Sequence, residues 1–206
     1  MTLSASEANQ LKQAPAADKV IPAVLHRWSP RAYADKPVSD ADLKTIFEAV
    51  RWTASSSNEQ PWRYIVGRKG SETYEKIFNS LFEGNQLWAG RAPVLMIGVA
   101  NGLTQKGTPN GAAVYDLGQS AAILVLQTAE LGLSAHQMGG YDRDKARHAL
   151  GIPAEYHLGA AIALGYQGEP SLLEIERLQQ AEASPRTRKE LGEFVFDAWG
   201  EPLSLG

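Results

Sequence analysis

Arginine and hydroxyl side chains alternate in a short segment near residue 30. Arg27, Ser29 and Arg31, in the sequence Arg-Trp-Ser-Pro-Arg, project to one side if the backbone is extended. Arginine forks match the oxygens of a phosphate monoester, which carries about −1.5 to −2 charges near neutral pH. The segment, with Trp28 inside it, therefore indicates an anion site. A surface charge cluster on a turn has the same composition.

A second segment combines small hydroxyl residues with carboxamides. Its candidate ligand-binding residues are Ser55, Ser56, Ser57, Asn58 and Gln60. Serines allow close approach of a ligand to the backbone, and each carboxamide offers a donor and an acceptor to the edge of a heterocycle. Pro61 restricts Gln60 to extended geometry. A plain loop between a helix and a strand is the alternative interpretation.

A third set of residues lies in the second half of the chain. Gln137, Met138, Gly139 and Gly140 precede Tyr141, and paired glycines let backbone N–H groups approach a ligand closely. Further on, Arg186 and Arg188 form a second arginine pair that would complete a phosphate site. Together the three segments predict a site for a flat, phosphorylated ligand with polar edges.

The composition excludes several other classes of protein. The chain has 206 residues, with 20 Lys and Arg against 23 Asp and Glu, and no cysteine. Disulfides, thiolate metal sites and cysteine nucleophiles are therefore excluded. A net charge of −3 argues against nucleic-acid binding, which needs a basic face. The 4 histidines form no HExxH motif, so we expect no bound metal.

Targeting and phosphate-loop motifs were also sought. No apolar run approaches the ~18 residues that span a bilayer, and residues 1–20 contain no signal-peptide core. We expect a cytoplasmic protein without a membrane partner. Residues 1–18 are expected to form a leader, frayed or folded as a short helix, and residues 19–206 a single domain. No GxGxxG or GxxxxGK[ST] sequence occurs, so standard dinucleotide and P-loop sites are not predicted.

Several helices and strands must position these segments. Ser39 should cap a helix that ends near Thr53, because apolar residues follow it at helical spacing. We expect further helices over 71–82 and 112–131 and strands over 64–66, 94–99 and 160–166, with four or five of each type in all. Their irregular alternation favours a mixed sandwich over a doubly wound sheet. Helix 112–131 is apolar on almost every side and must be covered by the domain or by a second subunit.

The order and spacing of these motifs resemble the nitroreductase family of FMN-dependent oxidoreductases. The resemblance runs from about Ile21 to Leu203 and rests on the early RxSxR, the SSxNxQPW block and the GG-aromatic turn. It implies an α+β sandwich with a mainly antiparallel central sheet flanked by helices, in an intertwined homodimer. The segment 194–196 would then be part of an arm that embraces the partner.

The resemblance also implies roles for the candidate residues. Arg27, Ser29, Arg31, Arg186 and Arg188 would bind the phosphate and pyrimidine edge of FMN, with Trp28 beside them. Ser55–Asn58 and Gln60 would reach FMN partly across the dimer interface. Gln137, Met138, Gly139 and Gly140 match the turn whose backbone N–H faces flavin N5. Asn85 is a better match than Asn79 for an asparagine of the family.

The implied activity is hydride transfer from NADH or NADPH through FMN to nitroaromatics, quinones or similar flat electrophiles, by a ping-pong mechanism. No side-chain acid or base is required, because the flavin carries the chemistry. A module that binds or sequesters FMN without nicotinamide turnover is the alternative, as is a specialised flavin reaction on the same fold. Many relatives have an acidic residue where this chain has Gly139.

Overall fold

A four-stranded antiparallel sheet forms the centre of the molecule in a computed structural model that describes residues 3–15 and 19–205. The strands, in spatial order, are β1 (Trp62–Arg68), β2 (Val94–Asn101), β4 (Tyr156–Gly165) and β3 (Ser134–Met138). All three neighbouring pairs are antiparallel. The fold is therefore α+β with an antiparallel sheet, as expected from the sequence.

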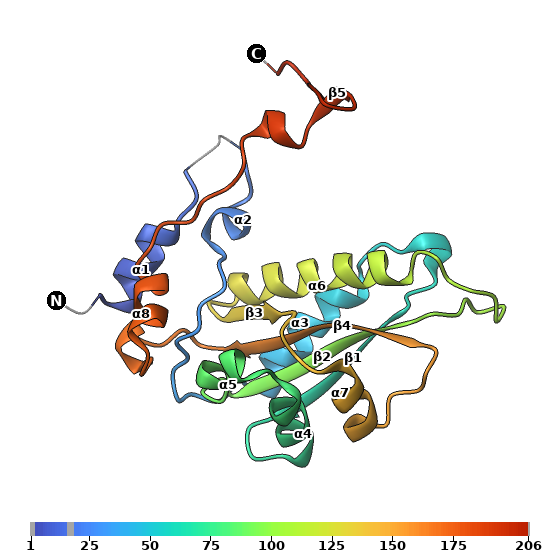
Figure 1. The fold of residues 1–206 in the computed structure, drawn as a ribbon, viewed down its shortest axis with the longest axis horizontal. Coiled ribbons are helices and arrows are strands. Elements are labelled where there is room, and N and C mark those ends of the chain that lie inside the picture. Colours follow the sequence, from blue (N-terminus) through green and yellow to red (C-terminus); the bar gives the residue numbers. More distant parts are fainter. Residues whose placement is uncertain (1–2, 16–18, 206) are drawn as a thin grey trace.

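Helices cover both faces of this sheet (Figure 1). α3 (Asp40–Arg51) and α6 (Ala113–Glu130) pack on one face, and α4 (Glu72–Ser80), α5 (Glu83–Ala89) and α7 (Arg143–Leu150) lie on the other. β2 is buried along almost its whole length, because its alternate residues enter the two hydrophobic clusters. The site is therefore built on a rigid, doubly covered sheet.

The first helices of the chain and the last one lie together beyond the β3 edge. α1 (Ala5–Lys12), α2 (Pro22–His26) and α8 (Glu176–Glu182) lie beside each other there (Figure 1). Residues 189–205, which we call the C-terminal arm, then leave the body and carry the short β5 (Phe196–Ala198) and β6 (Glu201–Pro202). The leader expected over 1–18 contains α1, while residues 1–2 and 16–18 lie outside the described residues.

The strongest sequence patterns correspond to the structure. Ser39 caps α3 by accepting a hydrogen bond from the Asp42 N–H at 3.0 Å. The helix predicted over 71–82 ends at Ser80 and is followed by the separate helix α5. The described residues contain eight α-helices and six strands, so the expected four or five of each type was wrong. The helices α2, α5, α7 and α8 were not predicted. α7 buries only Ala146, so it has no apolar stripe from which a helix could be recognised.

One face of α6 stays exposed although the helix is largely apolar. Val114 is 58% exposed and Tyr115 72% exposed. The C-terminal arm is similarly apolar and uncovered, with Trp199 96% exposed. Neither surface is covered by the described residues of the same chain. None of the helices in the described part of the chain has the length and hydropathy needed to cross a bilayer.

Candidate functional site

The segment from Arg27 to Arg31 begins where α2 ends, and Arg27 is the C-cap residue of this short helix. The Arg27 Nη2 group donates to the Ser29 hydroxyl at 3.2 Å, so the two candidate residues face the same space. Arg186 crosses from the C-terminal region to this segment. Its guanidinium donates to the Arg27 carbonyl at 2.6 Å and to the Leu25 carbonyl at 2.5 Å. The structure thus joins the first and the last arginine motifs.

These arginines form a positive cluster without a neutralising carboxylate. Burial lowers the pKa of Arg27, and the charges of Arg186 and Arg188 lower it further. Within residues 3–15 and 19–205, none of the three has a carboxylate at salt-bridge distance. The buried Nε atoms of Arg27 and Arg186 also have no hydrogen-bond partner in the described chain. Burying unpaired donors of one charge is costly, so this donor set fits an anion such as a phosphate monoester.

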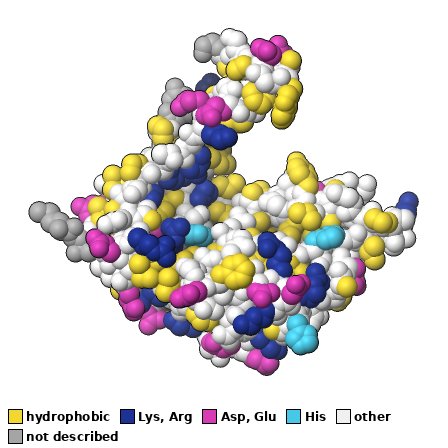
Figure 2. Space-filling model, viewed as in Figure 1, with side chains coloured by type: hydrophobic (Ala, Val, Ile, Leu, Met, Phe, Trp, Pro, Cys, Tyr) yellow, Lys and Arg dark blue, Asp and Glu magenta, His cyan; other side chains and the backbone are white. Residues whose placement is uncertain are grey.

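A cavity of about 240 Å³ opens beside the cluster. Its lining brings together the first and third sequence segments, because Arg27, Ser29 and Gln137 share it. The opposite wall is the middle of α6, with Ala122, Val125 and Leu126. Figure 2 shows Lys and Arg side chains gathered where the C-terminal arm leaves the body. A phosphate on the arginines would therefore have a half-apolar groove beside it for the rest of the molecule.

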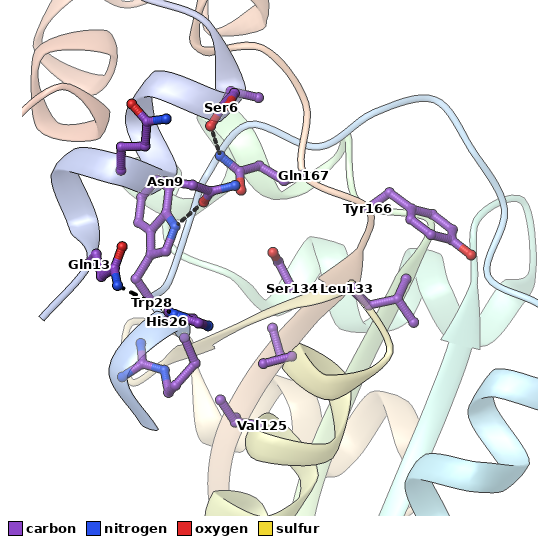
Figure 3. A pocket seen from close by; sticks show the side chains of 16 residues that line it. Ser6, Asn9, Gln13, His26, Trp28, Val125, Leu133, Ser134, Tyr166 and Gln167 are labelled. Carbon is purple, nitrogen blue, oxygen red and sulfur yellow. Dashed lines mark hydrogen bonds between the residues drawn. The ribbon is translucent and has the colours of Figure 1, made fainter. Parts of the chain in front are cut away.

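A larger cavity, of about 490 Å³, lies on the other side of Arg27. Figure 3 shows its carboxamide-rich lining from α1 and the following loop, including Asn9 and Gln13. Among the described residues that line it, Arg27 is the only one with a fixed charge. Arg186 and Arg188 do not line this cavity. The larger cavity is therefore a poorer candidate for a phosphate site than the smaller one beside the arginine cluster.

Three side chains support the Arg27–Arg31 segment from below. His136 Nδ1 lies 3.0 Å from the Pro30 carbonyl, and since a carbonyl can only accept, Nδ1 carries the proton. Burial lowers the pKa of His136 to about 4, so the ring is neutral at neutral pH. Asn9 accepts from the Trp28 indole at 2.7 Å (Figure 3), and Glu182 accepts from the Arg31 N–H. Trp28 is consequently a buried packing residue whose ring faces α1.

Arg31 points differently from the other arginines. Its Nη1 lies 3.7 Å from Glu182 Oε1, and it does not line the cavity shared by Arg27 and Ser29. The alternation Arg-x-Ser-x-Arg suggested three side chains on one side. In the structure Pro30 and the Glu182 contact turn the third away, so Arg27 and Ser29 are the pair brought together.

The serine-rich segment is strained. Ser57, Asn58 and Gln60 have φ angles of +50°, +56° and +46°, a region that non-glycine residues rarely adopt. The extended geometry expected of Gln60 before Pro61 was therefore wrong. The buried carboxylate of Asp116, on α6, accepts a hydrogen bond from the Ser56 N–H at 3.1 Å and so holds the segment. Strain maintained by a buried partner is typical of functional loops.

The serine-rich segment does not reach the cavity lined by Arg27 and Ser29, which we call the arginine cavity, within one chain. It is held at Asp116, in the first turn of α6, whereas the cavity begins at Ala122. Six residues of helix correspond to about 9 Å along its axis. A ligand that touches both groups would therefore need the serine-rich segment of a second copy, or a length greater than that of the cavity.

We expect the Asp116→Ala variant to lose about 1–2 kcal/mol of unfolding free energy, because the Ser56 N–H loses its partner. The midpoint of urea denaturation would measure this. Asp116→Asn is the matched control, since it keeps an acceptor oxygen and should retain most of the stability. Equal midpoints for wild type and Asp116→Ala would mean that the carboxylate does not hold the segment.

The glycine turn follows β3 directly. The N–H groups of Gly139 and Gly140 donate to no acceptor in the described part of the chain, so both remain free for a ligand. A Cβ on Gly139 would meet nothing within 4 Å. Asn85 Nδ2 donates to the Gly140 carbonyl at 2.9 Å, which fixes the turn. Met138 is buried in the core, so only its backbone can face a ligand.

Sequence reasoning missed Asp116, His136 and Glu182 as supports of the candidate loops. A single carboxylate in an apolar helix is a weak signal for Asp116, and His136 is a lone histidine outside any recognisable motif. Glu182 carried no signal, because it contacts a segment 151 residues away.

Comparison with known proteins gives the family. The model of the nitroreductase family matches residues 24–87. A 15.4 kDa protein of Mycolicibacterium smegmatis is 32% identical over 150 residues, which cover 68% of this chain and 99% of that protein. A protein of Thermus thermophilus named NADH dehydrogenase is 28% identical over 179 residues, covering 71% of this chain and 86% of that protein.

A solved structure agrees with the sequence comparisons. It is described as an oxidoreductase containing FMN and is 34% identical to this chain. The superposition has a TM-score of 0.83 and covers 89% of this chain and 94% of the other. The motifs, the antiparallel sandwich and these matches agree: the chain belongs to the nitroreductase family.

Proposed function

We propose that this protein is an FMN-dependent oxidoreductase that takes hydride from NADH or NADPH and passes electrons to a flat electrophile, such as a nitroaromatic or a quinone. The observation that carries the proposal is the cluster of Arg27, Arg186 and Arg188, which is positive, partly buried and without a carboxylate. FMN is a phosphate monoester, and the 34% identical solved structure is that of an FMN-containing oxidoreductase.

The residues present fit this cofactor in three places. Arg27, Arg186 and Arg188 would hold the phosphate, and Ser29 and Gln137 line the adjoining cavity, where hydroxyls of the ribityl chain need partners. The free N–H groups of the Gly139–Gly140 turn would face the ring system. Bound FMN supplies the two-electron chemistry, and the chain supplies binding, orientation and access.

The same site would be completed by a second copy of the chain. The exposed apolar side chains of α6 and of the C-terminal arm need cover, and a homodimer would provide it. In such a dimer, the strained Ser55–Gln60 segment of one copy would approach the arginine cavity of the other. This arrangement accounts for the separation of the two groups along α6 within one chain.

The proposed reaction has a kinetic signature. If nicotinamide and acceptor use one site in turn, double-reciprocal plots at several fixed acceptor concentrations will be parallel. The assay would follow NADH and NADPH oxidation with a benzoquinone and with a nitroaromatic. Intersecting lines would contradict the ping-pong order, and no acceptor-dependent oxidation would contradict the acceptor class.

The turn at Gly139 offers a variant that should separate reaction from folding. Gly139→Val is expected to slow flavin reduction by NADH at least about tenfold, a barrier increase of about 1.4 kcal/mol. The added side chain would start in open space, because a Cβ at this position has no neighbour within 4 Å. Stopped-flow absorbance would measure the reduction rate, and thermal unfolding of the apoprotein should be unchanged. The flavin reduction rate of Gly139→Ala should lie between those of wild type and Gly139→Val. A wild-type reduction rate in Gly139→Val would show that the flavin ring lies elsewhere.

A further inference from the structure

Glu182, the last residue of α8, is a wholly buried carboxylate at the edge of the candidate site. Its residue is 0% exposed. Oε1 and Oε2 accept from the Arg31 N–H at 3.2 Å and 3.3 Å. Burying a charge of this kind is costly unless several donors compensate it. We therefore expect the buried Glu182 carboxylate to stabilise the backbone conformation of the Arg27–Arg31 segment, which it contacts through the Arg31 N–H.

The segment in question depends on side chains for its shape. Between Arg27 and Arg31, the Arg27 carbonyl is held by Arg186, the Pro30 carbonyl by His136 and the Arg31 N–H by Glu182. Regular pairing resumes only after this segment, where the Gly168 N–H donates to the Ala32 carbonyl. Glu182 is the acidic member of this set, and it fixes the end opposite to Arg27.

Two cations face Glu182 from other elements. Arg31 lies at 3.7 Å, and Lys12 of α1 is buried nearby. The Lys12 ammonium donates to the Ala181 carbonyl at 2.6 Å and lies 5.0 Å from the centre of the Trp28 ring. The N-terminal helix, α8 and the Arg27–Arg31 segment are therefore joined around one carboxylate.

We infer that Glu182 is a positioning residue for the phosphate end of the cofactor: its carboxylate holds the backbone of the Arg27–Arg31 segment so that Arg27 and Ser29 face the arginine cavity. The inference rests on the proposed function, because it takes a flavin phosphate as the ligand. Glu182 acts through the segment and does not line the cavity itself.

Positioning and simple electrostatics predict opposite results for the loss of this charge. If Glu182 acted only through its field, removing a negative charge near the arginines would strengthen binding of an anion. If it positions the segment, its removal would weaken binding, because the Arg31 N–H, now shared between two charged oxygens, would keep only one uncharged oxygen as its acceptor. The sign of the change therefore decides between the two roles.

The experiment compares E182Q with wild type in equilibrium titrations of the full-length apoprotein, followed by quenching of flavin fluorescence. FMN and riboflavin are the two probes, because they differ only in the phosphate. We expect the FMN dissociation constant of E182Q to rise about tenfold, the effect of weakening one charge-assisted hydrogen bond, while that of riboflavin stays within about twofold. The matched control is E176Q, an exposed glutamate of the same helix, which should change neither constant.

The outcomes separate the hypotheses. Tighter or unchanged FMN binding by E182Q would overturn the inference. Equal losses for FMN and riboflavin would also overturn it, by showing a general structural role. Should E182Q unfold at the assay temperature, Glu182→Asp, which keeps both oxygens, is titrated instead, and the same ratio of the two constants decides. Failure of wild type to bind either flavin would instead refute the proposed function.

Discussion

Replacing Arg27 with alanine is expected to weaken FMN binding by about 1.5–3 kcal/mol, the usual contribution of a hydrogen bond to a charged group. Arg27 is the most buried member of the arginine cluster and the only one that also lines the cavity with Ser29. This loss corresponds to an increase of about 10-fold to 150-fold in the dissociation constant. Titration of the apoprotein with FMN at fixed ionic strength would measure it.

Arg188→Ala should show a loss in the same direction, because Arg188 belongs to the same positive field. Arg177→Ala is the matched control, since Arg177 is an exposed arginine on α8. Raising the salt concentration should weaken FMN binding by wild type more than by Arg27→Ala, because wild type has one more positive charge for the salt to screen. If FMN affinity were unchanged in both cluster variants, the phosphate would not bind at these arginines.

If the proposed homodimer forms, removing the C-terminal arm is expected to convert it to a monomer and to abolish tight FMN binding. The arm exposes large apolar side chains, among them Phe194 at 57% and Trp199 at 96%. Large apolar side chains gathered on an exposed segment mark an interaction surface. A chain that stops after Lys189 keeps Arg186 and Arg188, so the arginine cluster itself remains intact. Multi-angle light scattering and FMN titration of this variant would measure both effects.

A less drastic variant controls for damage to the fold. Trp199→Ala should weaken the dimer while the unfolding midpoint of the isolated monomer stays constant, because Trp199 contacts little of its own chain. A truncated protein that remains dimeric and binds FMN as wild type does would contradict the role of the arm.

Local patterns in the sequence predicted the elements that carry a strong periodic signal. α3 has a serine cap and an apolar stripe, β2 is a continuous apolar run, and α6 is a long apolar helix. β3 was missed because Ser134–Met138 mixes small and polar residues, and only one of its residues, Met138, joins the core of the far face. The pairing with β4, which makes it a strand, is not visible locally.

The candidate site divides in the same way. Arg27, Ser29 and Gln137 were identified from local motifs, and the fold brings them to one cavity. Arg31 was placed beside them by the alternation of side chains, but its contact with Glu182 draws it away. That contact joins residues 151 positions apart, and the contact of Asp116 with Ser56 joins residues 60 apart. Such supports depend on tertiary packing, so no spacing rule could have found them.

The proposed activity requires that flavin binds at this site and is reduced by a nicotinamide. The most direct test is a visible absorption spectrum of the protein loaded with FMN, recorded anaerobically before and after addition of NADH and then of NADPH. We expect an absorption band at a wavelength close to that of free oxidised FMN. This band should bleach with at least one of the two donors. A bound flavin whose band persists with both donors would contradict nicotinamide oxidation and favour a module that holds FMN without turnover. A protein that retains no flavin after incubation with FMN would contradict the central claim.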